Sequence, residues 1–151
     1  FGFDIGALIG NLTMSYVSHI VLKGEDKYTS WILKTIKEIL KMFEYKFLKI
    51  WEQEKESALI NEGFIDEEHL LYYKNEFLLN ILKDSVGFAG CKMARRMFGI
   101  AGVADIREIA SKEKKDLAIK LTLNVAKRFV VEHKYISSVE DVINIIKDEV
   151  R

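Results

Sequence analysis

The 151-residue sequence predicts an all-α fold, built as one helical domain over residues 1–151. The chain contains no proline, the residue that breaks helix interiors and central strands, so long uninterrupted helices are possible. Apolar residues recur at intervals of three and four along most of the chain, and no segment shows the alternation of a convincing strand. Hydrophobic residues make up 49% of the sequence, which is ample material for one core.

The first half of the chain predicts two helices with regular apolar stripes. The first is expected over 4–22, and a Gly-Glu-Asp break at 24–26 separates it from a long helix that ends near Glu56. The stripe of this second helix consists of Ile32, Ile36, Ile39, Leu40, Phe43, Phe47, Ile50 and Trp51. The Asn-Glu-Gly sequence at 61–63 indicates a loop, and Asp66 is expected to cap the next helix.

The second half of the chain predicts further helical segments. The region 66–98 is expected to divide near 83–87, and a short helix is expected over 105–110. A further helix is predicted over 111–133, with an apolar face made of Leu117, Leu121, Val125 and Phe129. A capping box of Ser137 and Glu140 is expected to begin the last helix, whose apolar residues are Val139, Val142, Ile143, Ile146 and Val150.

Small residues crowd the segment 87–104, which contains Gly87, Ala89, Gly90, Cys91, Ala94, Gly99, Ala101, Gly102 and Ala104. A glycine inside a helix costs about 1 kcal/mol relative to alanine. A segment that accepts this cost either packs tightly against its neighbours or leaves room for a ligand, and the sequence leaves both possibilities open.

Charge and composition exclude several classes of function. The net charge is +0, from 23 basic and 23 acidic residues, which argues against a nucleic-acid partner. No apolar stretch is expected to reach the ~20 residues that span a bilayer, and polar residues inside 1–22 argue against a signal segment. The single cysteine, Cys91, excludes an internal disulfide and suits a reducing cytoplasm, and we expect it to be buried.

Known catalytic motifs are absent from the sequence. It contains no P-loop, no Gly-x-Gly-x-x-Gly and no His-Glu-x-x-His. The three histidines, His19, His69 and His133, are far apart in sequence and are expected to be surface or capping groups, so no metal site is predicted.

Three residues stand out as functional candidates, the adjacent pair Arg95 and Arg96 and the separate Asp4. Arg95 and Arg96 are adjacent in a chain whose other basic residues are mostly lysine, and the guanidinium group suits phosphate and carboxylate ligands. Neighbouring helical residues point about 100° apart, so the two either bracket a ligand or consist of one exposed and one ion-paired arginine. Asp4 begins an apolar helix, where an N-cap is the ordinary interpretation.

Two segments resemble a known enzyme family. The segment 2–12, GFDIGALIGNL, is similar to the C-lobe of the 5-methylthioribose kinases, in the aminoglycoside-phosphotransferase and choline-kinase-like branch of the protein-kinase fold. The segment 87–106, GFAGCKMARRMFGIAGVADI, resembles the same family more sharply, and the order and separation of the two segments agree. Outside them the likeness consists of the helix pattern and of scattered positions such as Trp31 and Trp51. Gly102 departs from the histidine that the resemblance leads us to expect, whereas Lys92 and Ala94 occupy positions where variation is expected.

The resemblance implies a parent enzyme that transfers the γ-phosphate of ATP to the 1-hydroxyl of 5-methylthioribose, with Mg²⁺, in methionine salvage. It implies that Arg95 and Arg96 lie beside the sugar and the transferred phosphate, and that Asp4 accepts amide hydrogen bonds from the catalytic loop. The family's nucleotide-binding lobe, His-Gly-Asp loop and metal-binding Asp-x-Glu segment precede the first motif and are not in this sequence. We therefore expect no catalytic residue, no metal ligand and no phosphate transfer in this chain alone.

The resemblance also implies a homodimer, and the composition leads us to expect a cytoplasmic protein without nucleic-acid or membrane partners. Two alternatives stay open at this point. One is a freestanding helical interaction module in which the two arginines are structural. The other is a related kinase for another small alcohol, such as choline or an aminoglycoside.

Overall fold

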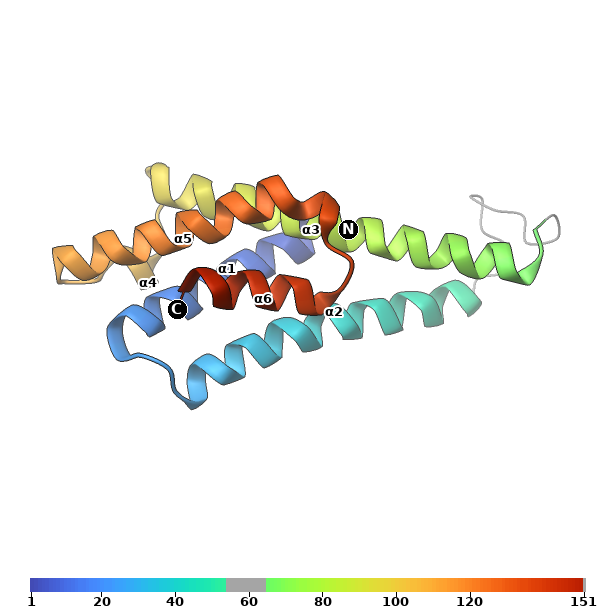
Figure 1. Ribbon diagram of the computed structural model, residues 1–151, viewed down its shortest axis with the longest axis horizontal. Helices are drawn as coiled ribbons and strands as arrows, with labels where there is room; N and C mark the ends of the chain where they lie inside the picture. Colours follow the sequence, from blue (N-terminus) through green and yellow to red (C-terminus); the bar gives the residue numbers. More distant parts are fainter. Residues whose placement is uncertain (54–64, 151) are drawn as a thin grey trace.

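The computed structural model describes residues 1–53 and 65–150, and this part of the chain is helical and contains no strand (Figure 1). The elements, in chain order, are α1 (Gly2–Lys23), α2 (Lys27–Gln53), α3 (Glu67–Phe98), α4 (Ala104–Arg107), α5 (Lys112–Glu132), the 3₁₀ turn η2 (His133–Tyr135) and α6 (Val139–Val150). The all-α prediction is confirmed. The loop predicted at 61–63 and the predicted end of the second helix lie outside the described residues.

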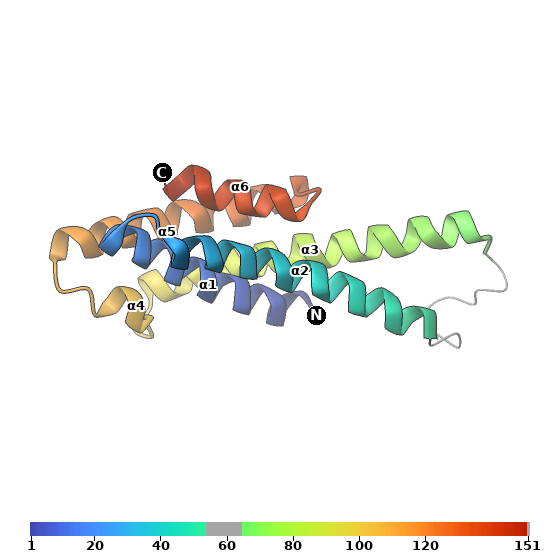
Figure 2. The same ribbon diagram turned by 90° about the horizontal axis from the view of Figure 1, so that it is seen from below.

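Helix α1 lies at the centre of the bundle, where it contacts α2, α3, α4, α5 and α6 (Figure 2). Its longest contact is with α3, and Ile9, Met14 and Val17 are fully buried. Contrary to the sequence expectation, α1 is long and apolar enough to meet the criteria for a membrane-crossing helix. Core helices of globular proteins meet the same criteria, and 44% of the relevant window is buried in the bundle.

Helix α3 is continuous, so the division predicted near 83–87 is wrong. Within this stretch the Ser85 hydroxyl donates a 2.7 Å hydrogen bond to the Ile81 carbonyl oxygen of the same helix. On the other side of α3, a Cβ at Gly90 would lie 2.7 Å from the Ala126 carbonyl oxygen of α5. Close helix packing therefore explains the small residues at this point of the segment and offsets their low helix propensity.

Helices α2 and α3 extend beyond the bundle and meet through aromatic side chains. Phe47 and Trp51 of α2 contact Phe77 of α3 at ring-centroid distances of 5.8 and 5.4 Å. Ile50, which was predicted to belong to the buried stripe, is instead 59% exposed. The apolar face of α2 is regularly buried only as far as Leu40. Beyond Leu40 the helix leaves the other helices and contacts chiefly α3.

Helix boundaries follow local capping chemistry. Asp66 caps α3 as predicted, since its carboxylate accepts a 2.9 Å hydrogen bond from the His69 amide. The last helix is capped one residue later than predicted, by Ser138 and Asp141 in place of Ser137 and Glu140. The short helix predicted over 105–110 covers only Ala104–Arg107, whereas α5 and α6 match their predicted spans closely.

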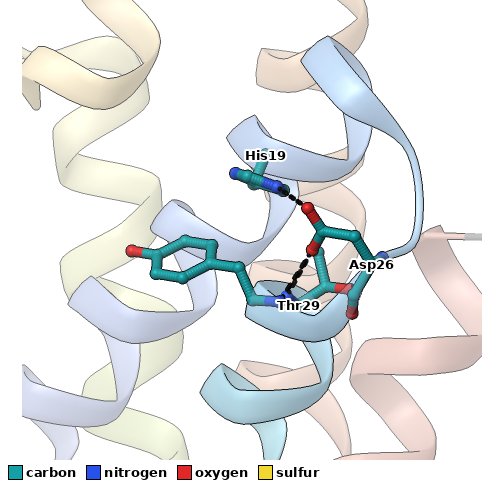
Figure 3. A network of polar contacts seen from close by, with 4 residues as sticks. His19, Asp26 and Thr29 are labelled. Atoms are coloured by element: carbon teal, nitrogen blue, oxygen red, sulfur yellow. Dashed lines mark hydrogen bonds and ion pairs between the residues drawn. The ribbon is translucent and has the colours of Figure 1, made fainter.

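A compact polar contact joins the end of α1 to the start of α2 (Figure 3). The Asp26 carboxylate accepts a 2.9 Å hydrogen bond from the Thr29 amide and lies 2.7 Å from Nε2 of His19. The side chain of His19, which was predicted to be a surface or capping group, is only 15% exposed and links α1 to the Asp26 carboxylate.

Candidate functional site

The two segments that carry the family resemblance pack against each other. Segment 2–12 lies in α1 and segment 87–106 begins in α3, and these two helices share the most extensive contact in the bundle. Phe3 and Phe88 form an edge-to-face pair with ring centroids 5.7 Å apart. The fold thus brings together residues that are more than eighty positions apart in sequence.

One stripe of α3 faces outward and contains Phe88, Cys91, Arg95 and Phe98, which are spaced three and four residues apart. The prediction that Cys91 is buried is therefore wrong. Residues before and after it in the helix, such as Ala89, Gly90 and Met93, face α1 and α5 and leave position 91 on the open side. Arg95 is exposed on this stripe and makes no ion pair with any carboxylate of residues 1–53 and 65–150.

Arg96 points in a different direction from Arg95. Its Nη1 donates a 2.8 Å hydrogen bond to the Ala101 carbonyl oxygen, and its Nε is buried without a hydrogen-bond partner in the described residues. The side chain lines a pocket of about 130 Å³ at the end of α3, which Arg95 does not line. Neither guanidinium forms an ion pair with a carboxylate of the described residues. The alternative in which one of the two arginines is held in a structural ion pair is therefore wrong.

Lys92 adds a third cation that the sequence analysis treated as a variable position. Its ammonium donates a 3.1 Å hydrogen bond to the Ala7 carbonyl oxygen of α1. Burial lowers the pKa of this ammonium, and the charges of Arg96 and Arg95 lower it further. Lys92, Arg95 and Arg96 lie at i, i+3 and i+4 on α3, so the helix concentrates positive charge beside α1.

Asp4 is exposed in the first turn of α1. The helix begins at Gly2 with Phe1 at the N-cap position, so the ordinary N-cap interpretation of Asp4 is wrong. Asp4 makes no ion pair or side-chain hydrogen bond with the part of the chain that the structure describes, and its carboxylate is free to accept hydrogen bonds.

The arrangement suits anion binding and not metal binding. Among residues 1–53 and 65–150, no three His, Cys, Asp or Glu side chains are grouped to hold a metal ion. A larger cavity of about 470 Å³ lies among α1, α2, α3 and α6. Its charged lining residues are Glu44, Glu76 and Glu140 with one cation, Lys41, so it is less suited to an anion.

Comparison with known proteins gives a consistent result. No protein-family model matches the chain. Methylthioribose kinase 2 of rice (Oryza sativa subsp. japonica) is 34% identical over 149 residues, which cover 94% of this chain and 35% of the relative. Methylthioribose kinase 1 of rice is 33% identical over the same shares, and the methylthioribose kinase of Bacillus cereus strain ATCC 10987 is 36% identical over 142 residues.

The chain spans about a third of the length of these curated relatives. The match covers 94% of this chain, and the helical fold agrees with it. Over nearly its whole length the chain is therefore similar to a C-terminal part of the methylthioribose kinases.

Proposed function

We propose that this chain is the C-terminal helical part of an ATP-dependent kinase that phosphorylates the 1-hydroxyl of 5-methylthioribose in methionine salvage. The observation that carries the proposal is the 34% identity to a methylthioribose kinase over 94% of the chain, combined with unpaired arginines on α3. The proposal includes a cytoplasmic location, a homodimeric enzyme, and ATP with Mg²⁺ as cofactors of the whole protein.

Arg95 and Arg96 supply positive charge to the substrate and phosphate site in this proposal. Phosphoryl transfer depends on positioning and on neutralising charge on the equatorial oxygens, which fixed guanidinium groups do well. The two side chains diverge on α3, so they contact different parts of the ligand and do not form one clamp. Asp4 acts as a positioning residue that accepts amide hydrogen bonds from the catalytic loop.

The chain itself is proposed to supply no step of proton transfer or metal binding. Within the described residues no acidic cluster suits Mg²⁺, so we assign no metal ligand to these helices. We expect this chain alone to transfer no phosphate from ATP.

The test is an activity assay on the protein encoded by the complete reading frame that contains this chain. With ATP, Mg²⁺ and 5-methylthioribose, we expect a new phosphomonoester at carbon 1, detected by ³¹P NMR. Choline and an aminoglycoside, supplied in parallel, should give no product, and turnover of either in place of the sugar would favour the related-kinase alternative.

A freestanding interaction module remains the competing function. It predicts that neither the complete protein nor this chain binds methylthioribose or its phosphate. Saturable binding of the sugar phosphate that is lost in Arg95→Ala would exclude the module, whereas no binding and no turnover would contradict the kinase proposal.

A further inference from the structure

A small pocket at the end of the bundle is lined by cations from three separate elements. It lies where α3 ends and α4 and α5 begin, on the left in Figure 1, and its volume is about 130 Å³. Arg96 comes from α3, Arg107 from α4 and Lys115 from α5. The remaining lining residues are glycine and apolar side chains, and no acidic residue is among them.

The positions of these three cations are not explained by internal ion pairs. None of the three pairs with a carboxylate of residues 1–53 or 65–150. Bringing like charges together is unfavourable. The repulsion among these three cations is reduced only by solvent screening or by a bound anion. Lys115 and Arg96 are both partly buried, so solvent screens the charges of these two side chains less completely.

Arg96 has an unused donor at the same place. Its Nη1 is held by the Ala101 carbonyl oxygen at 2.8 Å, which fixes the plane of the guanidinium group. Its Nε is buried and has no acceptor among the described residues. Buried donors are nearly always paired, so this unpaired Nε is an exception among the described residues.

Gly102 makes room for the second arginine. A Cβ at this position would lie 3.2 Å from Cδ of Arg107, tighter than an ordinary contact. The absent side chain therefore leaves room for the Arg107 side chain beside Gly102, and both residues line the pocket.

We propose that Arg96, Arg107 and Lys115 form a binding site for a tetrahedral oxyanion, namely phosphate or the phosphoryl group of a phosphomonoester. Two planar guanidinium groups and one compact ammonium match the donor pattern that phosphate binds in proteins. The pocket is far larger than the ~10–15 Å³ that one water molecule needs. The site shares Arg96 with the proposed kinase function but does not depend on it.

The test is a titration of the ¹⁵N-labelled 151-residue chain with inorganic phosphate at constant ionic strength. We expect saturable shifts of the Arg96 Nε–Hε signal and of the amides of 99–107. Arg107→Gln and Lys115→Gln should each weaken binding about tenfold. Neither side chain makes a hydrogen bond or ion pair within the described residues, so both variants are expected to fold normally.

Lys120→Gln is the matched control, because it removes one exposed positive charge from α5 outside the pocket. It should leave phosphate binding unchanged. The absence of saturation, or an equal loss in Lys120→Gln and Lys115→Gln, would overturn the proposal, since the effect would then be general screening.

A second arm identifies the source of the anion. Methylthioribose 1-phosphate that displaces inorganic phosphate and binds more tightly assigns the site to the sugar phosphate, whereas equal affinity assigns it to the free anion. Phosphate binding without kinase activity in the complete protein would contradict the proposed function and leave this site intact. Kinase activity without phosphate binding at Arg107 and Lys115 would contradict the phosphate site and leave the proposed kinase function intact.

Discussion

Gly6 of α1 lies against the carbonyl oxygen of Ser85 in α3, at a distance where a Cβ would be only 2.3 Å from that oxygen. This contact belongs to the helix pair that joins the two family-like segments. Because the obstacle is backbone and not a flexible side chain, a methyl group at Gly6 must push the helices apart.

Gly6→Ala should lower the free energy of unfolding by about 2 kcal/mol or more, as overpacking of a close contact outweighs the gain in helix propensity. Urea unfolding followed by circular dichroism measures it. Gly87→Ala is the matched control, because its Cβ would meet only His133 at an ordinary 3.5 Å. It should raise stability by about 0.5–1 kcal/mol. A neutral Gly6→Ala would show that α1 and α3 are farther apart than described.

The thiol of Cys91 should react in the folded protein. It lies on the outward stripe of α3, so a water-soluble thiol reagent should modify one group per chain at the same rate with and without denaturant. Release of the chromophore from an aromatic disulfide reagent measures this rate. A reaction that begins only after unfolding would show that Cys91 is buried and would contradict its exposure on α3.

The contact between Asp26 and His19 should make stability depend on acid pH. Hydrogen bonds from the Thr29 amide, and then from His19, lower the pKa of the Asp26 carboxyl below its usual 3.8. A carboxyl with a lowered folded pKa stabilises the fold above its unfolded pKa, and this contribution is lost as pH falls through the folded value.

Asp26→Asn should therefore be less stable than the parent near neutral pH, and the difference should shrink as pH falls below about 4. Urea midpoints measured from about pH 6 to pH 3 check this. Glu25→Gln, which removes a neighbouring exposed carboxylate, serves as the control and should keep the parent's stability. A difference for Asp26→Asn that stays constant across this range would contradict the linkage.

Local patterns were enough to predict most helices but not their orientation. The spacing of Ile32, Ile36 and Leu40 predicts a buried stripe, and the stripe is buried. The continuity of α3 through Ser85 and Gly87 depends instead on α1 and α5 packing over it, which no local signal contains. The exposure of Cys91 follows from the same packing.

The cations of the pocket show how far functional residues can be predicted from sequence patterns. Arg96 was recognised from its neighbour Arg95 and from the family resemblance, because both signals are local in sequence. Arg107 and Lys115 have no local pattern that distinguishes them from surface residues, and only the turn at 99–103 brings them to Arg96. The glycine at 102 was noted as a departure, but its role in seating Arg107 required the folded chain.

The effect of Arg95 on phosphoryl transfer tests the central claim most directly. In the protein encoded by the complete reading frame, kcat/KM for 5-methylthioribose should fall about 10²–10³-fold in Arg95→Ala, with partial recovery in Arg95→Lys. The melting temperature should stay unchanged, because Arg95 is exposed and unpaired in the described residues. Equal kcat/KM in the parent and in Arg95→Ala would contradict the assignment of this arginine to the sugar-phosphorylation site.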